Sequence, residues 1–133
     1  MELALTPSAA PTKAAKIAGY TLTGLSTLFL LMDGAVKFTT VPQVLEANAK
    51  LGIPAGVVPA IGALELALLA LTLVPRTAIL GAILFTGYLG GATAMHVRVG
   101  DPVFFPILIG AMLWGGLLLR DRRARDLMTA ALR

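Results

Sequence analysis

Six polar side chains lie inside or at the ends of long apolar segments, where ionisable groups are costly and therefore often functional. Glu65 is the most demanding, because it is the single charge of its segment and lies well inside it. A carboxyl group there can accept or donate a proton, and His96, the only histidine, supplies a second acid–base group. The predicted catalytic residues are Glu65, His96 and Asp33, and the predicted substrate-binding residues are Lys37, Arg98 and Tyr88.

The two cations near these groups indicate how a substrate would be held. Lys37 and Arg98 can face an anionic or polarised substrate atom. Asp33 lies four residues before Lys37 on the same helical face, so the two can pair and Lys37 is fixed in place. The competing interpretation is a buried polar network that only orients the helices, and the sequence leaves both interpretations open.

The composition predicts an integral membrane protein in contact with a lipid bilayer. Of 133 residues, 57% are hydrophobic and 14% are charged, against about 25% charged residues in ordinary soluble domains, and the mean hydropathy is +0.85. The basic residues flank apolar segments, so the net charge of +4 reflects membrane topology and no nucleic-acid partner is expected. Without cysteine, and with one histidine, the chain predicts no disulfide and no metal site.

The elements that must position these residues are predicted from hydropathy and from the placement of proline and glycine. We expect an all-α fold, an antiparallel four-helix bundle in the membrane. Pro75 and Arg76 leave only a tight turn, so the second and third spans form a hairpin that makes Tyr88 and His96 available to Glu65. The predicted spans are residues 16–38, 57–74, 77–97 and 103–119.

The segments outside the spans are expected to be short. Residues 1–15 are predicted to be a flexible tail without a cleaved signal peptide, so that the first span stays as an anchor. Residues 39–56 hold a short helix that begins near Pro42 and is expected to lie at the membrane surface. Residues 122–133 are predicted to be a basic cytoplasmic tail.

The distribution of Lys and Arg predicts the orientation. Four crossings place both termini on one side, which then holds eight of these cations, whereas the other side holds three. Positive residues concentrate on the cytoplasmic side of membrane proteins, so both termini are expected in the cytoplasm.

Small residues recur at intervals of four along the third span. Gly87 with Gly91, and Gly90 with Ala94, are pairs typical of closely packed membrane helices. They exceed what one bundle needs, which makes a homodimer plausible as a further partner interaction. GYLGG lies inside an apolar helix, so it does not predict a nucleotide-binding loop.

A family resemblance is carried by several runs of the sequence. They are GALELALLALTLVPRTAILGAILFTGYLGGATAMHVRVGDP and LWGGLLLRD, together with DGAVKF and LGIPAGVVP. Over roughly residues 16–121 the chain resembles the DoxX-like family of small bacterial four-helix membrane proteins. The wider family is similar to the membrane subunit of a thiosulfate:quinone oxidoreductase. The resemblance therefore implies the bacterial inner membrane, a quinone as cofactor and an oxidoreductase as partner.

Three functions follow from these observations. The first is a quinone-linked or oxidoreductase-associated membrane subunit with a polar intramembrane pocket. The second is a membrane enzyme that performs acid–base chemistry, such as ring opening, isomerisation or cyclisation, on a small lipophilic substrate. The third is a structural or transport protein. Whether the chain is an enzyme is left open by the sequence.

Overall fold

The computed structural model describes residues 7–132, and over these residues the fold is all-helical, as predicted. The four long helices are α1 (Lys13–Val36), α3 (Val58–Leu73), α4 (Ala78–Val99) and α5 (Phe104–Arg120). Three short elements join or follow them, namely α2 (Pro42–Lys50), the 3₁₀ turn η1 (Ala55–Val57) and α6 (Arg122–Ala131).

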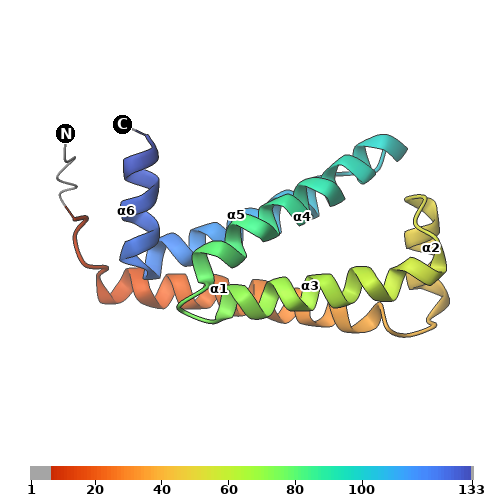
Figure 1. Cartoon of the computed structure of the whole chain (residues 1–133), viewed down its shortest axis with the longest axis horizontal. Coiled ribbons are helices and arrows are strands. Elements are labelled where there is room, and N and C mark those ends of the chain that lie inside the picture. The colour runs from red at the N-terminus through yellow and green to blue at the C-terminus, as the bar shows by residue number, and fades with distance from the viewer. Residues whose placement is uncertain (1–6, 133) are drawn as a thin grey trace.

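The long helices pack side by side along one axis. α1 contacts both α5 and α3, α3 contacts α4, and α4 contacts α5. α1 begins, and α6 lies, at the same end as the α3–α4 turn, whereas α2 lies at the other end, where α4 diverges from α3 (Figure 1). The helices are therefore tightly packed at one end and open at the other.

Three helical segments are long and apolar enough to cross a membrane, namely α1, η1 with α3, and α4. A fourth candidate consists of α5 and α6, which are bent by 109° relative to each other. Side chains such as Tyr20, Met32 and Phe104 are more than 60% exposed on the outside of the helices, where a bilayer would cover them.

The predicted helix bounds agree with the observed ones to within three residues. The short helix predicted after the first span is α2, with Pro42 in its first turn. The region predicted as a basic tail is helical from Arg122 to Ala131, because Asp121 accepts a hydrogen bond from the Arg123 amide and caps α6. Of the predicted N-terminal tail, residues 1–6 lie outside the described residues, as does Arg133, and α1 already begins at Lys13.

The predicted packing role of the α4 glycines is wrong within this chain. A Cβ atom on Gly87, Gly90 or Gly91 would meet no other atom within 4 Å. The close approach on α4 occurs instead at Gly81, where a Cβ atom would lie 2.5 Å from the backbone nitrogen of Thr72. The reason is that α4 is tied to α3 by the short turn at its start and diverges from α3 further along.

Replacing Gly81 by alanine tests this packing. The added methyl group would overlap the α3 backbone, so the hairpin must open and the free energy of unfolding should fall by about 1–3 kcal/mol. Gly90→Ala on the same helix is the matched control, because it meets no atom and gains up to about 1 kcal/mol of helix propensity. Thermal unfolding followed by circular dichroism in detergent compares them, and equal midpoints would contradict the packing described.

Candidate functional site

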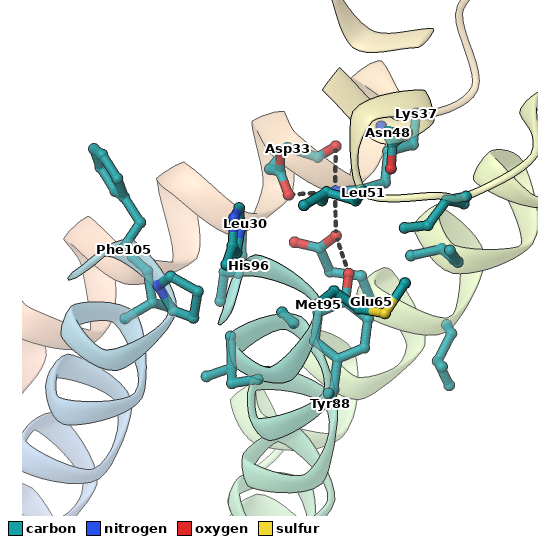
Figure 2. A pocket seen from close by; sticks show the side chains of 18 of the residues that line it. Leu30, Asp33, Lys37, Asn48, Leu51, Glu65, Tyr88, Met95, His96 and Phe105 are labelled. Atoms are coloured by element: carbon teal, nitrogen blue, oxygen red, sulfur yellow. Dashed lines mark hydrogen bonds and ion pairs between the residues drawn. The ribbon is translucent and has the colours of Figure 1, made fainter. Parts of the chain in front are cut away.

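A cavity of about 580 Å³ lies where α4 diverges from α1 and α3. Side chains of α1, α2, α3, α4 and α5 line it, and most of its wall is apolar (Figure 2). The polar groups on the wall include five of the six predicted site residues, namely Asp33, Lys37, Glu65, Tyr88 and His96. Residues up to 80 positions apart in sequence, Phe29 and Ile109, are thus brought to one place.

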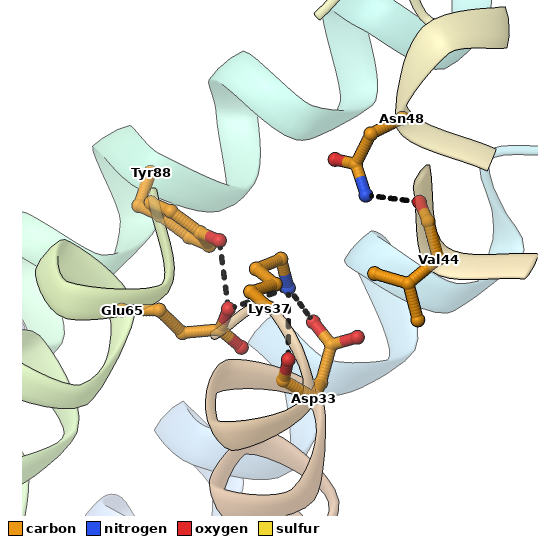
Figure 3. A network of polar contacts seen from close by, with 6 residues as sticks. All are labelled: Asp33, Lys37, Val44, Asn48, Glu65 and Tyr88. Atoms are coloured by element: carbon orange, nitrogen blue, oxygen red, sulfur yellow. Dashed lines mark hydrogen bonds and ion pairs between the residues drawn. The ribbon is translucent and has the colours of Figure 1, made fainter. Parts of the chain in front are cut away.

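Four of these residues form one connected group, which we term the Glu65 cluster: Asp33, Lys37, Glu65 and Tyr88. Lys37 Nζ donates to Glu65 Oε2 at 2.8 Å and also bonds the Asp33 carboxylate (Figure 3). The Tyr88 hydroxyl donates to the same Glu65 oxygen at 2.9 Å. The Glu65 side chain is completely buried. A buried carboxylate is thus held by a cation from α1 and a hydroxyl from α4.

The local sequence explains why Lys37 reaches Glu65. Gly34 on α1 and Gly62 on α3 face each other one turn before these two residues, and a Cβ atom on Gly62 would lie 2.8 Å from both the Gly34 carbonyl oxygen and Lys37 Cβ. The two helices can approach this closely only because both positions lack a side chain. On α4, the Tyr88 ring is oriented by an edge-on contact with the buried Phe85 ring, at a centroid distance of 5.5 Å.

In the Glu65 cluster, the hydrogen-bond donors of Lys37 are all used, whereas some carboxylate acceptors are not. The Lys37 ammonium group bonds Glu65, the Asp33 carboxylate and, at 3.3 Å, the Asp33 carbonyl oxygen, so its three donors are occupied. In contrast, Glu65 Oε1 is buried and has no hydrogen-bond partner among residues 7–132. In Figure 2 this oxygen lies off the line of hydrogen bonds. Unused hydrogen-bonding capacity in the cluster therefore lies on the carboxylates, at the second oxygen of Glu65 and of Asp33, rather than on Lys37.

His96 and Arg98 occupy different environments. His96 lines the cavity, and its Nδ1 atom is buried, forms no hydrogen bond within the described part of the chain and lies 3.9 Å from the Asp101 carboxylate. Arg98 does not line the cavity and donates instead to the Leu51 carbonyl oxygen at 2.8 Å. Together with the ion pair between Lys50 and Asp101, at 2.6 Å, this bond fastens the end of α2 to the end of α4. Arg98 thus holds the element that covers the cavity.

Several lining residues were missed by sequence reasoning. Asn48 and Leu51 at the end of α2 face the cavity, and Phe29 and Phe105 stack over it with ring centroids 6.1 Å apart. A usable signal existed for Asn48, because it lies one turn after Val44 on the partly apolar side of the short helix. Gly87 and Gly91 also line the cavity, so two of the three α4 glycines that do not pack against another helix form part of its wall.

These features define a small helical membrane protein with a polar cluster inside an apolar cavity. The chain belongs to the DoxX-like family, whose model matches residues 21–116 and so includes every residue of the Glu65 cluster. This match confirms the resemblance drawn from the sequence. No curated protein and no solved structure was found to match the chain.

Removing the central cation tests the energetics of the cluster. Lys37→Met leaves two carboxylates without their shared partner, so the free energy of unfolding should fall by about 3–5 kcal/mol. Adding Glu65→Gln should restore a large part of that loss, because the amide carries no charge and still accepts from Tyr88. Thermal unfolding of the single and double variants measures this coupling. Additive losses in the double variant would show that the two residues do not interact.

Proposed function

We propose that this protein is a quinone-binding membrane subunit that works with an oxidoreductase partner. The observation that carries the proposal is the buried, unpartnered Oε1 atom of Glu65 in an apolar cavity. A quinol hydroxyl can donate to this atom when the carboxyl group is ionised, and a protonated carboxyl group can donate to a quinone carbonyl. The Glu65 carboxyl group can thus form a hydrogen bond with both the oxidised and the reduced form of the ligand.

The size and the walls of the cavity support a flat lipophilic ligand. Its volume of about 580 Å³ lies within the usual range of small-molecule pockets, roughly 300–1,000 Å³. Gly87 and Gly91 give one smooth wall, and Phe29 and Phe105 give an aromatic one. Phe29, Leu64 and Phe105 are 42–59% exposed on the lipid-facing exterior while lining the cavity, so the proposed ligand enters sideways from the bilayer.

The proposed topology is an antiparallel bundle with four crossings in the bacterial inner membrane. α5 alone is the fourth span, because its 17 residues extend about 26 Å, close to the roughly 30 Å of hydrocarbon. The end formed by the start of α1, the α3–α4 turn and α6 is rich in Arg and Lys, so it and both termini are placed in the cytoplasm. α2 then lies at the outer surface, above the cavity.

Cysteine labelling tests this orientation, since the natural chain has no cysteine. Glu46→Cys on α2 and Arg76→Cys in the α3–α4 turn are both exposed positions. A membrane-impermeant maleimide added to spheroplasts, which lack the outer membrane, should label the first variant and spare the second until the inner membrane is opened. The reverse pattern would place the termini outside.

Binding of decylubiquinone to the purified protein in nanodiscs tests the ligand. Gly91→Leu places a side chain in the cavity, and its Cβ atom would meet no described atom within 4 Å, so binding should be lost. Gly90 does not line the cavity, so Gly90→Leu should bind as the natural protein does. Glu65→Gln should bind the quinol about 10- to 100-fold more weakly, because a hydrogen bond to a charged group is lost. Equal affinities for the Gly90 and Gly91 variants would rule out this cavity as the quinone site.

A second function is favoured by one observation, the convergence of Glu65, Tyr88 and His96 on the same cavity. A carboxylate with a free oxygen, a phenol and an imidazole provide the groups needed for proton transfer to and from a small lipophilic substrate. This proposal expects a lipophilic compound other than a quinone to co-purify and to be converted by the natural protein but not by Glu65→Gln. A variant that only unfolds at lower temperature would favour the structural or transport role.

The oxidoreductase partner and the homodimer are proposed on different grounds. The partner is supported by what the family resemblance implies. The homodimer is supported by the open glycine face of α4, where Gly90 meets no other part of the chain. Purification in mild detergent followed by mass determination separates a monomer, a dimer and a complex with a second protein.

A further inference from the structure

The C-terminal helix α6 points away from the axis of the bundle, and none of its residues lines the cavity. Its axis makes an angle of 109° with that of α5. If α5 is close to the membrane normal, α6 lies within about 20° of the membrane plane. We infer that α6 is an amphipathic surface helix that binds anionic phospholipid headgroups of its own leaflet. The inference rests on the proposed topology and not on the proposed quinone.

The helix presents an apolar face toward the bundle. Ala124 is 1% exposed and packs in a cluster with Ala78, Ala82 and Leu117. Positions three, four and seven residues further along lie on the same helical face, and they are Leu127, Met128 and Ala131. α6 projects away from the axis of the bundle (Figure 1). In the inferred position, the exposed part of this apolar face meets lipid. Leu127 is 47% exposed and Met128 39%.

The opposite face of α6 is polar. Arg122, Asp126 and Thr129 share it, with Arg125 at its edge. Around it, the same end of the bundle carries further cations but only two acidic side chains among the described residues, Asp121 and Asp126. This surplus of positive charge complements anionic headgroups. The further cations of this end are Lys13, Lys16, Arg76, Arg120 and Arg123.

Hydrogen bonds to three parts of the chain hold α6 in this position. Arg123 pairs with Asp121 at 2.9 Å and donates to the Pro75 carbonyl oxygen in the α3–α4 turn at 2.6 Å. Arg125 donates to the Ala9 carbonyl oxygen at 3.0 Å. The Arg123 side chain holds the pKa of Asp121 below its usual range, so this corner is ionised at neutral pH. The helix is therefore a fixed part of the fold.

Two other placements of α6 agree less well with these observations. As the second half of a broken span, α6 would bring Arg122, Arg123, Arg125 and Asp126 into hydrocarbon, where charged side chains are costly to bury. As a helix in water, it would leave Leu127 and Met128 exposed without a partner. Only the surface position satisfies both faces.

Spin labels on single cysteines test the depth of α6 in the full-length protein. Labels at Leu127→Cys and Met128→Cys are compared with a label at Thr129→Cys in nanodiscs of phosphatidylcholine with phosphatidylglycerol. The first two should collide preferentially with oxygen, which concentrates in lipid, and the third with a water-soluble nickel complex. Preference for nickel at all three positions, or for oxygen at all three, would overturn the inference. Unchanged decylubiquinone binding by these variants would show that the outcome is independent of the cavity.

Substitutions that remove or keep the charge of Arg122 test whether α6 selects anionic headgroups. Native mass spectrometry measures how strongly phosphatidylglycerol is retained relative to phosphatidylcholine. Arg122→Gln should lower this preference about fivefold, the effect expected for one cation near an anionic surface, and Arg122→Lys should keep it. Equal lipid preference in all three proteins would show that α6 lies at the surface without selecting anionic lipid, which overturns that part of the inference.

Discussion

The fold is organised around one buried ion pair, that between Lys37 and Glu65. A carboxylate with no exposed surface persists only if a cation and hydrogen bonds replace the water that it has lost. Lys37 supplies the cation from α1 and Tyr88 supplies a hydroxyl from α4, so one residue of α3 links three of the four long helices. The glycine contact between α1 and α3 exists next to this pair and makes it geometrically possible.

The same interaction shapes the cavity and its chemistry. Because Asp33 and Glu65 share Lys37, the ammonium group has no donor left, and the remaining capacity lies on the second oxygen of each carboxylate, of which that of Glu65 is buried. The divergence of α4 from α3 opens apolar space beside that oxygen, and α2 closes this space at the end, fastened by Arg98 and Lys50. The site therefore places a few polar groups, grouped around Glu65, within a mostly apolar enclosure.

Much of the fold could be predicted from the sequence, because hydropathy and the prolines and glycines at helix ends act locally. The pair between Asp33 and Lys37 was predictable for the same reason, since four residues on a helix make one turn. The contact between Lys37 and Glu65 was not predicted, because it depends on how closely α1 approaches α3. The bond from Arg98 to the Leu51 carbonyl oxygen was not predicted either, because it depends on where the end of α2 lies relative to α4. Gly87 and Gly91 resembled a packing motif, and only the course of α4 reveals these two as cavity wall.

The central claim is that the free oxygen of Glu65 receives the ligand. Infrared difference spectroscopy, recorded as decylubiquinone or its quinol binds to the protein in nanodiscs, observes that carboxyl group directly. We expect a change in a carboxyl band that is absent from the Glu65→Gln variant and that differs between quinone and quinol. Ligand binding that leaves every carboxyl band of the natural protein unchanged would contradict it.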